Sequence, residues 1–320
     1  MGARRSVTAA VIVATLALAA CGSTTRSGEA GAPDEADRGT DAAAAVLDDD
    51  AVTVGSFDFP ESELLAEIYG RALNGAGFEV ELEIGLGPRE FVQPALDRGL
   101  VELVPEYAGT ALQFVTMGAS VPSDDATATT RALGRVLREH RLLALTPAPA
   151  QDANAVVVTR DLADRHALDE ISDLADLAPR LRFGGPPGCP DRPFCLGGME
   201  DTYDLHFDDF LPLDVGGPLT HQALAGGHVD VALLFTTDPR LLSDDLVVLD
   251  DDRNLQPAEN VTPVVRYEVV ERWGDPFVEA VDAVSRRLTT AELQALNAQV
   301  AAGEPRDEVA AGWLRREGLA

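Results

Sequence analysis

The chain has 320 residues, 46% of them hydrophobic, and its 54 acidic side chains outnumber the 25 basic ones to give a formal charge of -29. Length and composition predict a folded protein with enough residues for two domains. The acidic balance argues against nucleic acid as a partner, because phosphate contacts need a basic surface. The sequence contains no lysine, which excludes Schiff-base and P-loop chemistry.

The N-terminus has the pattern of an export signal. Two arginines precede the apolar run Val7–Ala20, which ends in Leu-Ala-Ala immediately before Cys21. The run is short for a membrane span and has the charged start and small-residue end of a secretory signal. Cys21 directly after these small residues resembles the lipobox of bacterial lipoproteins, in which the cysteine is lipidated and becomes the first residue of the mature chain. The resemblance implies that residues 1–20 are removed and that Cys21 is lipidated, the alternative being a plain signal with an incidental cysteine. The small, polar and acidic residues 21–50 predict a disordered tether. The protein is therefore expected to be extracytoplasmic and lipid-anchored to the outer face of the cell membrane.

The folded part opens with alternating strands and helices. Residues 51–54 predict a buried strand, with an exit loop over residues 55–59. Pro60 then begins a helix with acidic residues in its first turn, where they complement the helix dipole. Residues 78–84 alternate as a second strand. The opening therefore reads as a β-α-β-α-β arrangement of an α/β protein.

One unit of the sequence occurs twice. Residues 95–107 align without a gap on residues 223–235, and both copies run from a helix tail through a glycine stop and an acid into a β-rich segment. Tyr107 closes one copy and Phe235 the other. Ligands of open α/β sheets bind beyond the carboxyl ends of the strands. We therefore predict two related lobes with these aromatic residues facing each other across a cleft, the alternative being a chance match between common residues.

The remaining pattern predicts where the chain passes between the lobes. Periodicity breaks at 147–154, which we interpret as the first crossing, and a turn at 236–239 is interpreted as the return. The strands at 247–249 and 261–265 and the C-terminal helices then complete the first lobe. The prediction is lobe one over 51–153 and 239–320, and lobe two over 154–238.

Cys189 and Cys195 flank a proline-rich segment in lobe two. Outside the cytoplasm such thiols are expected to form a disulfide, and a metal site is the alternative. Neither cysteine has a neighbouring histidine, so no metal and no cofactor are expected. The sequence lacks the Gly-x-Ser-x-Gly and His-Glu-x-x-His motifs, so an enzyme is not predicted.

Four motifs together are distinctive: Gly55-Ser-Phe-Asp-Phe-Pro-Glu61, Gly85-Leu-Gly-Pro-Arg-Glu90 through Thr110, Gly184-Gly-Pro-Pro through Cys195, and Phe235-Thr-Thr-Asp-Pro239. From about residue 51 to its C-terminus the chain resembles the glycine betaine/choline/osmoprotectant substrate-binding lipoproteins of ABC importers. The resemblance implies an α/β, two-lobed periplasmic-binding-protein-like fold with two interdomain crossings and a ligand cleft between the lobes. It also implies capture of a small quaternary ammonium solute by lobe closure and delivery to the permease subunits. A sensor or scavenger of the same fold is the alternative, followed by an extracytoplasmic enzyme.

The expected ligand indicates which residues bind it. A trimethylammonium group has no conventional hydrogen-bond donor, so aromatic faces suit it, whereas a betaine carboxylate needs an arginine. Polar residues at the crossings come onto a ligand when the lobes close. The predicted ligand-binding residues are Phe57, Phe59, Arg89, Tyr107, Asp152, Asn154, Arg192, Phe235 and Thr236. The sequence departs from well-known betaine binders in having Gln151-Asp-Ala-Asn154 after the first crossing, where a tyrosine is frequent.

Overall fold

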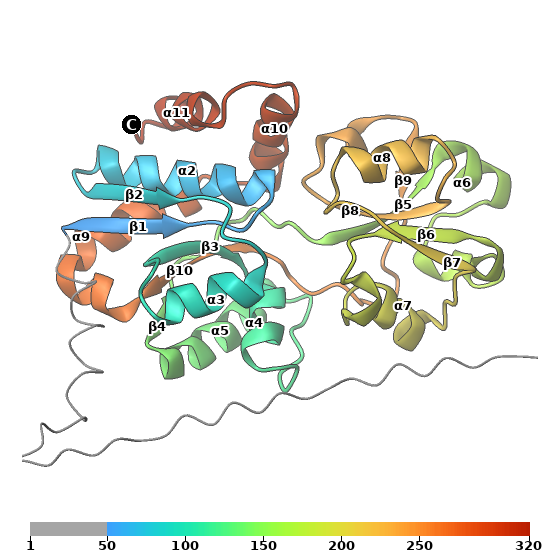
Figure 1. The fold of residues 1–320 in the computed structure, drawn as a ribbon, viewed down its shortest axis with the longest axis horizontal. Helices are drawn as coiled ribbons and strands as arrows, with labels where there is room; N and C mark the ends of the chain where they lie inside the picture. Colours follow the sequence, from blue (N-terminus) through green and yellow to red (C-terminus); the bar gives the residue numbers. More distant parts are fainter. Residues whose placement is uncertain (1–49) are drawn as a thin grey trace, which may run out of the picture. The chain divides into compact units, whose positions relative to one another are not determined.

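The computed structural model describes residues 50–320, and these residues form two α/β lobes, each built on its own five-stranded sheet (Figure 1). The expected two-lobed fold is confirmed. The predicted signal, Cys21 and the tether before residue 50 lie outside the described residues. Within residues 50–320 no helix is both long enough and apolar enough to cross a membrane.

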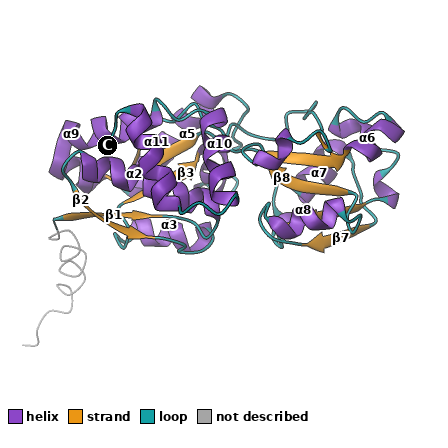
Figure 2. Ribbon diagram, turned by 90° about the horizontal axis from the view of Figure 1, so that it is seen from above, coloured by secondary structure: helices purple, strands orange, loops and turns teal. Residues whose placement is uncertain are grey.

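Lobe one contains the sheet β2-β1-β3-β10-β4. Strands β1, β2 and β3 run parallel, whereas β10 is antiparallel to both β3 and β4. Helices lie on both sides of the sheet (Figure 2). The elements are β1 (Ala51–Gly55), α2 (Pro60–Gly75), β2 (Glu79–Glu83), α3 (Arg89–Asp97), β3 (Leu103–Tyr107), α4 (Ala108–Val115), α5 (Ala126–Leu137), η2 (Arg138–His140), β4 (Leu142–Ala144), β10 (Val261–Arg266), α9 (Tyr267–Ser285), α10 (Thr290–Ala301) and α11 (Arg306–Glu317).

Lobe two contains the sheet β7-β6-β8-β5-β9, in which β5 is antiparallel to both of its neighbours. Position by position, its parallel and antiparallel pairings are those of the lobe-one sheet. The elements are β5 (Asn154–Thr159), α6 (Arg160–His166), η3 (Ile171–Leu174), η4 (Ala178–Arg180), β6 (Arg182–Gly185), η5 (Cys189–Asp191), α7 (Leu196–Tyr203), β7 (Asp209–Pro212), α8 (Pro218–Ala225), β8 (Val231–Phe235), η6 (Pro239–Leu242) and β9 (Leu246–Val248).

The sequence repeat corresponds to the same structural unit in each lobe. It covers α3 with β3 in lobe one and α8 with β8 in lobe two, and both strands take the third position of their sheets. The acid of each copy has the same role. A Glu102 carboxylate oxygen accepts the backbone N–H of Thr53 at 3.2 Å, and Asp230 accepts that of Arg182 at 2.9 Å. Each acid therefore ties the start of its strand to the neighbouring parallel strand.

The position of the return crossing differs from the prediction. Strand β9 pairs with β5, with Val248 opposite Val157, so this segment belongs to lobe two and not to lobe one. The return crossing consequently lies between β9 and β10, over residues 249–260, and not at 236–239. The apolar residues of β9 do not indicate which of the two sheets the strand joins, because the pairing of an edge strand depends on a partner distant in sequence.

The two crossings run beside each other and are hydrogen-bonded. The N–H of Asp152 donates to the carbonyl of Glu259 at 3.1 Å, and the N–H of Val261 donates to that of Ala150 at 3.0 Å. The segment after β8 joins them, because the N–H of Thr236 donates to the carbonyl of Ala153 at 2.9 Å. Three chain segments therefore meet between the lobes. Asp152 of the first crossing and Glu259 of the return crossing are paired by a backbone hydrogen bond.

Local sequence signals explain most element ends. Pro60 occupies the first turn of α2, and Thr289 caps α10 by accepting the N–H of Glu292 at 3.2 Å. The Glu292 carboxylate accepts the indole N–H of the buried Trp313. Helix α9 contains a kink at Gly274, whose φ is 62°.

Candidate functional site

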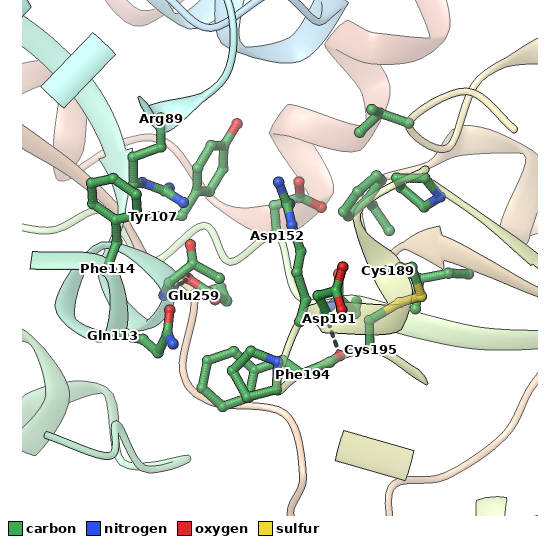
Figure 3. A pocket seen from close by; sticks show the side chains of 18 of the residues that line it. Arg89, Tyr107, Gln113, Phe114, Asp152, Cys189, Asp191, Phe194, Cys195 and Glu259 are labelled. Atoms are coloured by element: carbon green, nitrogen blue, oxygen red, sulfur yellow. Dashed lines mark hydrogen bonds between the residues drawn. A yellow bond between two sulfur atoms is a disulfide. The ribbon is translucent and has the colours of Figure 1, made fainter. Parts of the chain in front are cut away.

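A cavity of about 270 Å³ is lined by both lobes and by both crossings (Figure 3). Its volume is just below the range of about 300–1,000 Å³ that is usual for drug-sized ligands, so it suits a small solute. Five aromatic side chains contribute to the lining, three from lobe one and two from lobe two. They are Phe59, Tyr107 and Phe114, and Phe194 and Phe235.

The loop after β1 and the end of β3 form an aromatic cluster in lobe one. The Phe59 and Tyr107 ring centroids are 6.0 Å apart with an interplanar angle of 30°, and Phe57 stacks on Phe59 at 5.9 Å. Phe57 is only 4% exposed and is absent from the cavity lining, whereas Phe59 is half-buried and lines it. Of the two phenylalanines, the structure therefore places Phe59 at the cavity and Phe57 behind it.

Arg89 lines the cavity at the start of α3, but its guanidinium is already engaged. It forms a paired contact with the Glu106 carboxylate, with Nη2 to Oε2 at 2.8 Å and Nε to Oε1 at 3.2 Å. Its Cζ also lies 5.0 Å from the Phe57 ring centroid. Burial by itself would lower the pKa of Arg89, but the charge and hydrogen bonding of Glu106, together with the charges of Glu259 and Tyr107, outweigh it and the pKa is raised. Because its donors are used by Glu106, Arg89 is less available to bind a ligand carboxylate than the sequence suggested.

A buried acidic network lies behind Tyr107, where the first crossing meets α2 and α10. The Tyr107 hydroxyl donates to Glu61 Oε1 at 2.8 Å, and the Asn297 amide donates to Glu61 Oε2 at 2.6 Å. Thr237 donates to Asp152 Oδ1 at 2.7 Å. Burial raises the pKa of Glu61, and burial together with the nearby Glu61 charge raises the pKa of Asp152. The two carboxyl groups therefore favour a state in which they share a proton, and Asp152 presents this pair to the cavity.

A second buried acid, Glu259, lines the cavity from the return crossing and is 4% exposed. Its carboxylate accepts the backbone N–H groups of Gly109 and Thr110, each at 3.0 Å, at the start of α4. Burial raises the pKa of Glu259 to about 8, although these hydrogen bonds and the Arg89 charge act in the opposite direction. Near neutral pH this side chain is therefore poised between its acid and carboxylate forms.

The lobe-two wall is built on the loop that joins β6 to α7. Cys189 and Cys195 form a disulfide, which confirms the expected pairing, and Arg192 and Phe194 lie between them. The Asn154 amide donates to the Phe194 carbonyl at 2.8 Å and so attaches this loop to the start of β5. In the described part of the chain the Arg192 side chain has no hydrogen-bond or ion-pair partner. Arg192 is thus the cavity arginine that is available to a ligand carboxylate.

Phe235 ends β8 in the position equivalent to Tyr107 on β3, as the repeat predicted. Gly216 makes room for its ring, since a Cβ at this glycine would lie 2.6 Å from Phe235 Cδ2. The next residue, Thr236, is absent from the cavity lining. Its hydroxyl accepts the N–H of Ala153 at 3.0 Å and donates to the carbonyl of Gln151 at 3.3 Å. Thr236 therefore links the segment after β8 to the first crossing by hydrogen bonds.

The structure brings most of the predicted ligand-binding residues together at one cavity. Phe59, Arg89, Tyr107, Asp152, Asn154, Arg192 and Phe235 line it, whereas Phe57 and Thr236 lie behind it. Sequence reasoning missed Thr110, Gln113, Phe114, Phe194 and Glu259. Phe194 had a usable signal, because it lies between the two cysteines. Glu259 had none, because its approach to α4 depends on the path of the return crossing. Among the described residues no cluster of histidine, cysteine and acidic side chains is arranged to hold a metal ion.

Residues 50–316 match the family described as the substrate binding domain of ABC-type glycine betaine transport systems. The glycine-betaine-binding protein of Pseudomonas aeruginosa is 30% identical over 289 residues, covering 87% of this chain and 91% of that protein. Glycine betaine-binding protein YehZ of Escherichia coli is 28% identical over 286 residues, covering 83% and 90% of the two chains. A crystal structure of a glycine betaine/carnitine/choline ABC transporter superposes with a TM-score of 0.70 at 23% identity, covering 84% of this chain and 99% of that one. This last likeness concerns the fold.

Proposed function

Because the chain belongs to the family of substrate-binding domains of ABC-type glycine betaine transport systems, we propose that it captures a small quaternary ammonium solute, such as glycine betaine or choline, and delivers it to a membrane permease. Members of this family are binding proteins of transporters and not enzymes. The observation that carries the proposed ligand class is the aromatic lining of the cavity, to which both lobes contribute.

The chemistry of the lining suits a permanently charged, methylated ammonium group. Such a group offers no N–H donor, so its favourable contacts are with ring faces and with negative charge. Tyr107 and Phe59 provide rings from lobe one, and Phe235 and Phe194 provide rings from lobe two. Each cation–π contact contributes about 0.5–2 kcal/mol, the upper end applying where water is excluded. A solute that contacts both lobes also stabilises the closed arrangement of the lobes, with the crossings acting as the hinge.

Arg192 provides a polar counterpart to the aromatic rings. An unpaired guanidinium at the cavity forms a strong paired interaction with a carboxylate, which glycine betaine has and choline lacks. We therefore assign the carboxylate end of a betaine to Arg192. The engaged Arg89 is left to support the aromatic cluster through Phe57 and Glu106.

Calorimetric titration of the mature chain with glycine betaine and with choline tests the proposal. Arg192→Ala should weaken glycine betaine binding by roughly tenfold or more and choline binding by much less, since charged hydrogen bonds contribute about 1.5–3 kcal/mol. Arg165→Ala is the matched control, because Arg165 is an exposed lobe-two arginine paired with Asp161 outside the cavity lining. Equal losses for the two solutes would make Arg192 structural. Folded protein that binds no quaternary amine would contradict the proposed ligand class.

The anchoring part of the proposal rests on the sequence around Cys21. A lipid on this cysteine would hold the protein at the outer face of the cell membrane, close to the permease. Cys21→Ser in the native host should release the protein from the membrane fraction or leave it unprocessed. A variant that is still cleaved at this point and still lipidated would contradict the assignment.

A further inference from the structure

Glu259 occupies an unusual position for an acidic side chain. It is almost fully buried, it lines the cavity, and it comes from the return crossing, opposite Asp152 of the first crossing. Figure 3 shows Glu259 on the same side of the cavity as Tyr107, Gln113 and Phe114. The carboxyl group therefore lies on the lobe-one side, where the aromatic rings favour the cationic end of a solute.

Close packing fixes the position of this carboxyl group. The return crossing approaches the start of α4 at Gly109, where a Cβ would lie only 2.7 Å from Pro257 Cγ. This approach lets both Glu259 carboxylate oxygens accept N–H groups, with Thr110 N at 3.0 Å from Oε1 and 3.1 Å from Oε2. Oε2 alone accepts both N–H groups, from Gly109 at 3.0 Å and from Thr110 at 3.1 Å, so a neutral amide with its oxygen at this position would still cap α4.

We propose that Glu259 is a specificity-determining residue whose carboxylate supplies the counter-charge for the cationic group of the bound solute and selects it over a neutral molecule of the same shape. This inference rests on the proposed function and deepens it. Aromatic rings attract a cation but also accept a neutral tert-butyl group, so rings alone discriminate weakly between the two. A buried carboxylate on the same side of the cavity favours the cation over the neutral molecule, because its charge attracts a cation strongly where water is excluded.

The neighbouring charges are consistent with this role. Among the described residues, the cation that contributes most to the electrostatics of Glu259 is Arg89, which is already paired with Glu106. Helix α4 itself, Ala108–Val115, carries no charged side chain. The charged and titratable groups around the cavity are Arg89 and Glu90 of α3, Glu106 and Tyr107 of β3, Asp152 of the first crossing, and Asp191 and Arg192 of lobe two. The lobe-one side is thus richer in carboxyl groups than in free cations.

If Glu259 supplies the counter-charge, binding of a cation should also change the protonation of its carboxyl group, which can be measured separately from affinity. With a pKa of about 8, Glu259 holds a proton for much of the time near pH 7 in the ligand-free protein. An entering cation favours the ionised form, so binding should release up to about one proton. Affinity for a cationic solute should consequently rise as the pH is raised from about 6 to 8.5.

The experiment compares the wild-type chain with Glu259→Gln, using choline and its neutral carbon analogue 3,3-dimethylbutan-1-ol as probes. Glutamine keeps one oxygen, which can accept the Gly109 and Thr110 N–H groups as Oε2 does. It loses the second contact of Thr110 with Oε1, and it removes the charge. We expect choline binding to weaken by roughly tenfold or more at pH 8.5, while binding of the neutral analogue is unchanged or stronger. Glu292→Gln is the matched control, because that carboxylate also accepts an N–H but lies outside the cavity lining.

A second measurement needs no variant. Titrating the wild-type chain with choline near pH 7, in buffers of different protonation enthalpy, should give heats that differ by the enthalpy of the released proton. If Glu259→Gln keeps wild-type choline affinity at pH 8.5, or if no proton is released, Glu259 is a structural cap of α4 and the inference is wrong while the proposed function stands. A wild-type chain that binds no quaternary amine overturns both.

Discussion

Tyr107 has two separable roles, and replacing it by phenylalanine or by leucine distinguishes them. The side chain is 6% exposed, its ring lies 6.0 Å from that of Phe59, and its hydroxyl donates to Glu61 at 2.8 Å. Both substitutions remove the hydroxyl, but only Tyr107→Phe keeps an aromatic face towards the cavity. Leucine fills part of the space and offers no π electrons.

The stability effect follows from the buried hydrogen bond. A hydrogen bond to a charged group contributes about 1.5–3 kcal/mol, and Asn297 still donates to Glu61 in either variant, so we expect a loss near the lower figure for Tyr107→Phe. At about 2–4 °C per kcal/mol for a chain of this size, the melting temperature should fall by roughly 3–6 °C. Tyr107→Leu should fall further, because it also loses ring packing in the core. Circular dichroism melts measure both effects.

The binding effect follows from the ring. Tyr107→Phe should change glycine betaine affinity by less than about threefold, whereas Tyr107→Leu should weaken it by roughly 3- to 30-fold, the equivalent of one cation–π contact. Calorimetry at a temperature where both variants are folded gives the two dissociation constants. If the phenylalanine variant loses as much affinity as the leucine variant, the hydroxyl contact with Glu61 controls binding and the ring-face argument is refuted.

Three further outcomes are expected. The double substitution of Cys189 and Cys195 by serine should lower the free energy of unfolding by about 2 kcal/mol, measured in guanidinium; an unchanged value would mean that the bridge is dispensable. Burial raises the pKa values of Glu61, Asp152 and Glu259, so the proton shared by Glu61 and Asp152 and the proton on Glu259 both stabilise the folded state. Stability should therefore fall as the pH rises from about 5 to 8, and a rise in chemical unfolding experiments at several pH values would exclude this. Small-angle scattering should give a smaller radius of gyration with saturating glycine betaine, and an unchanged profile with proven binding would indicate a rigid pocket.

Local patterns in the sequence were sufficient to predict the two lobes. The repeated helix, glycine stop and β-rich segment predicted equivalent units, and the structure places them as β3 and β8 at the same position of two sheets. Because ligands of such sheets bind beyond the carboxyl ends of the strands, the sequence predicted Tyr107 and Phe235 as ligand-binding residues, and the structure places both at the cavity. The disulfide was also accessible, since Cys189 and Cys195 are near neighbours in the chain and their pairing needs no distant partner.

Only the tertiary structure decided features that depend on distant partners. The segment β9 joined the second sheet because it pairs with β5, and this moved the return crossing to residues 249–260. That path brings Glu259 against the start of α4, a contact between residues about 150 positions apart. Arg89 looked equivalent to Arg192 as a carboxylate partner until the fold placed Glu106 beside it. Side-chain chemistry sets what each group can bind, but burial and neighbouring charge, which arise only on folding, decide whether it is free to do so.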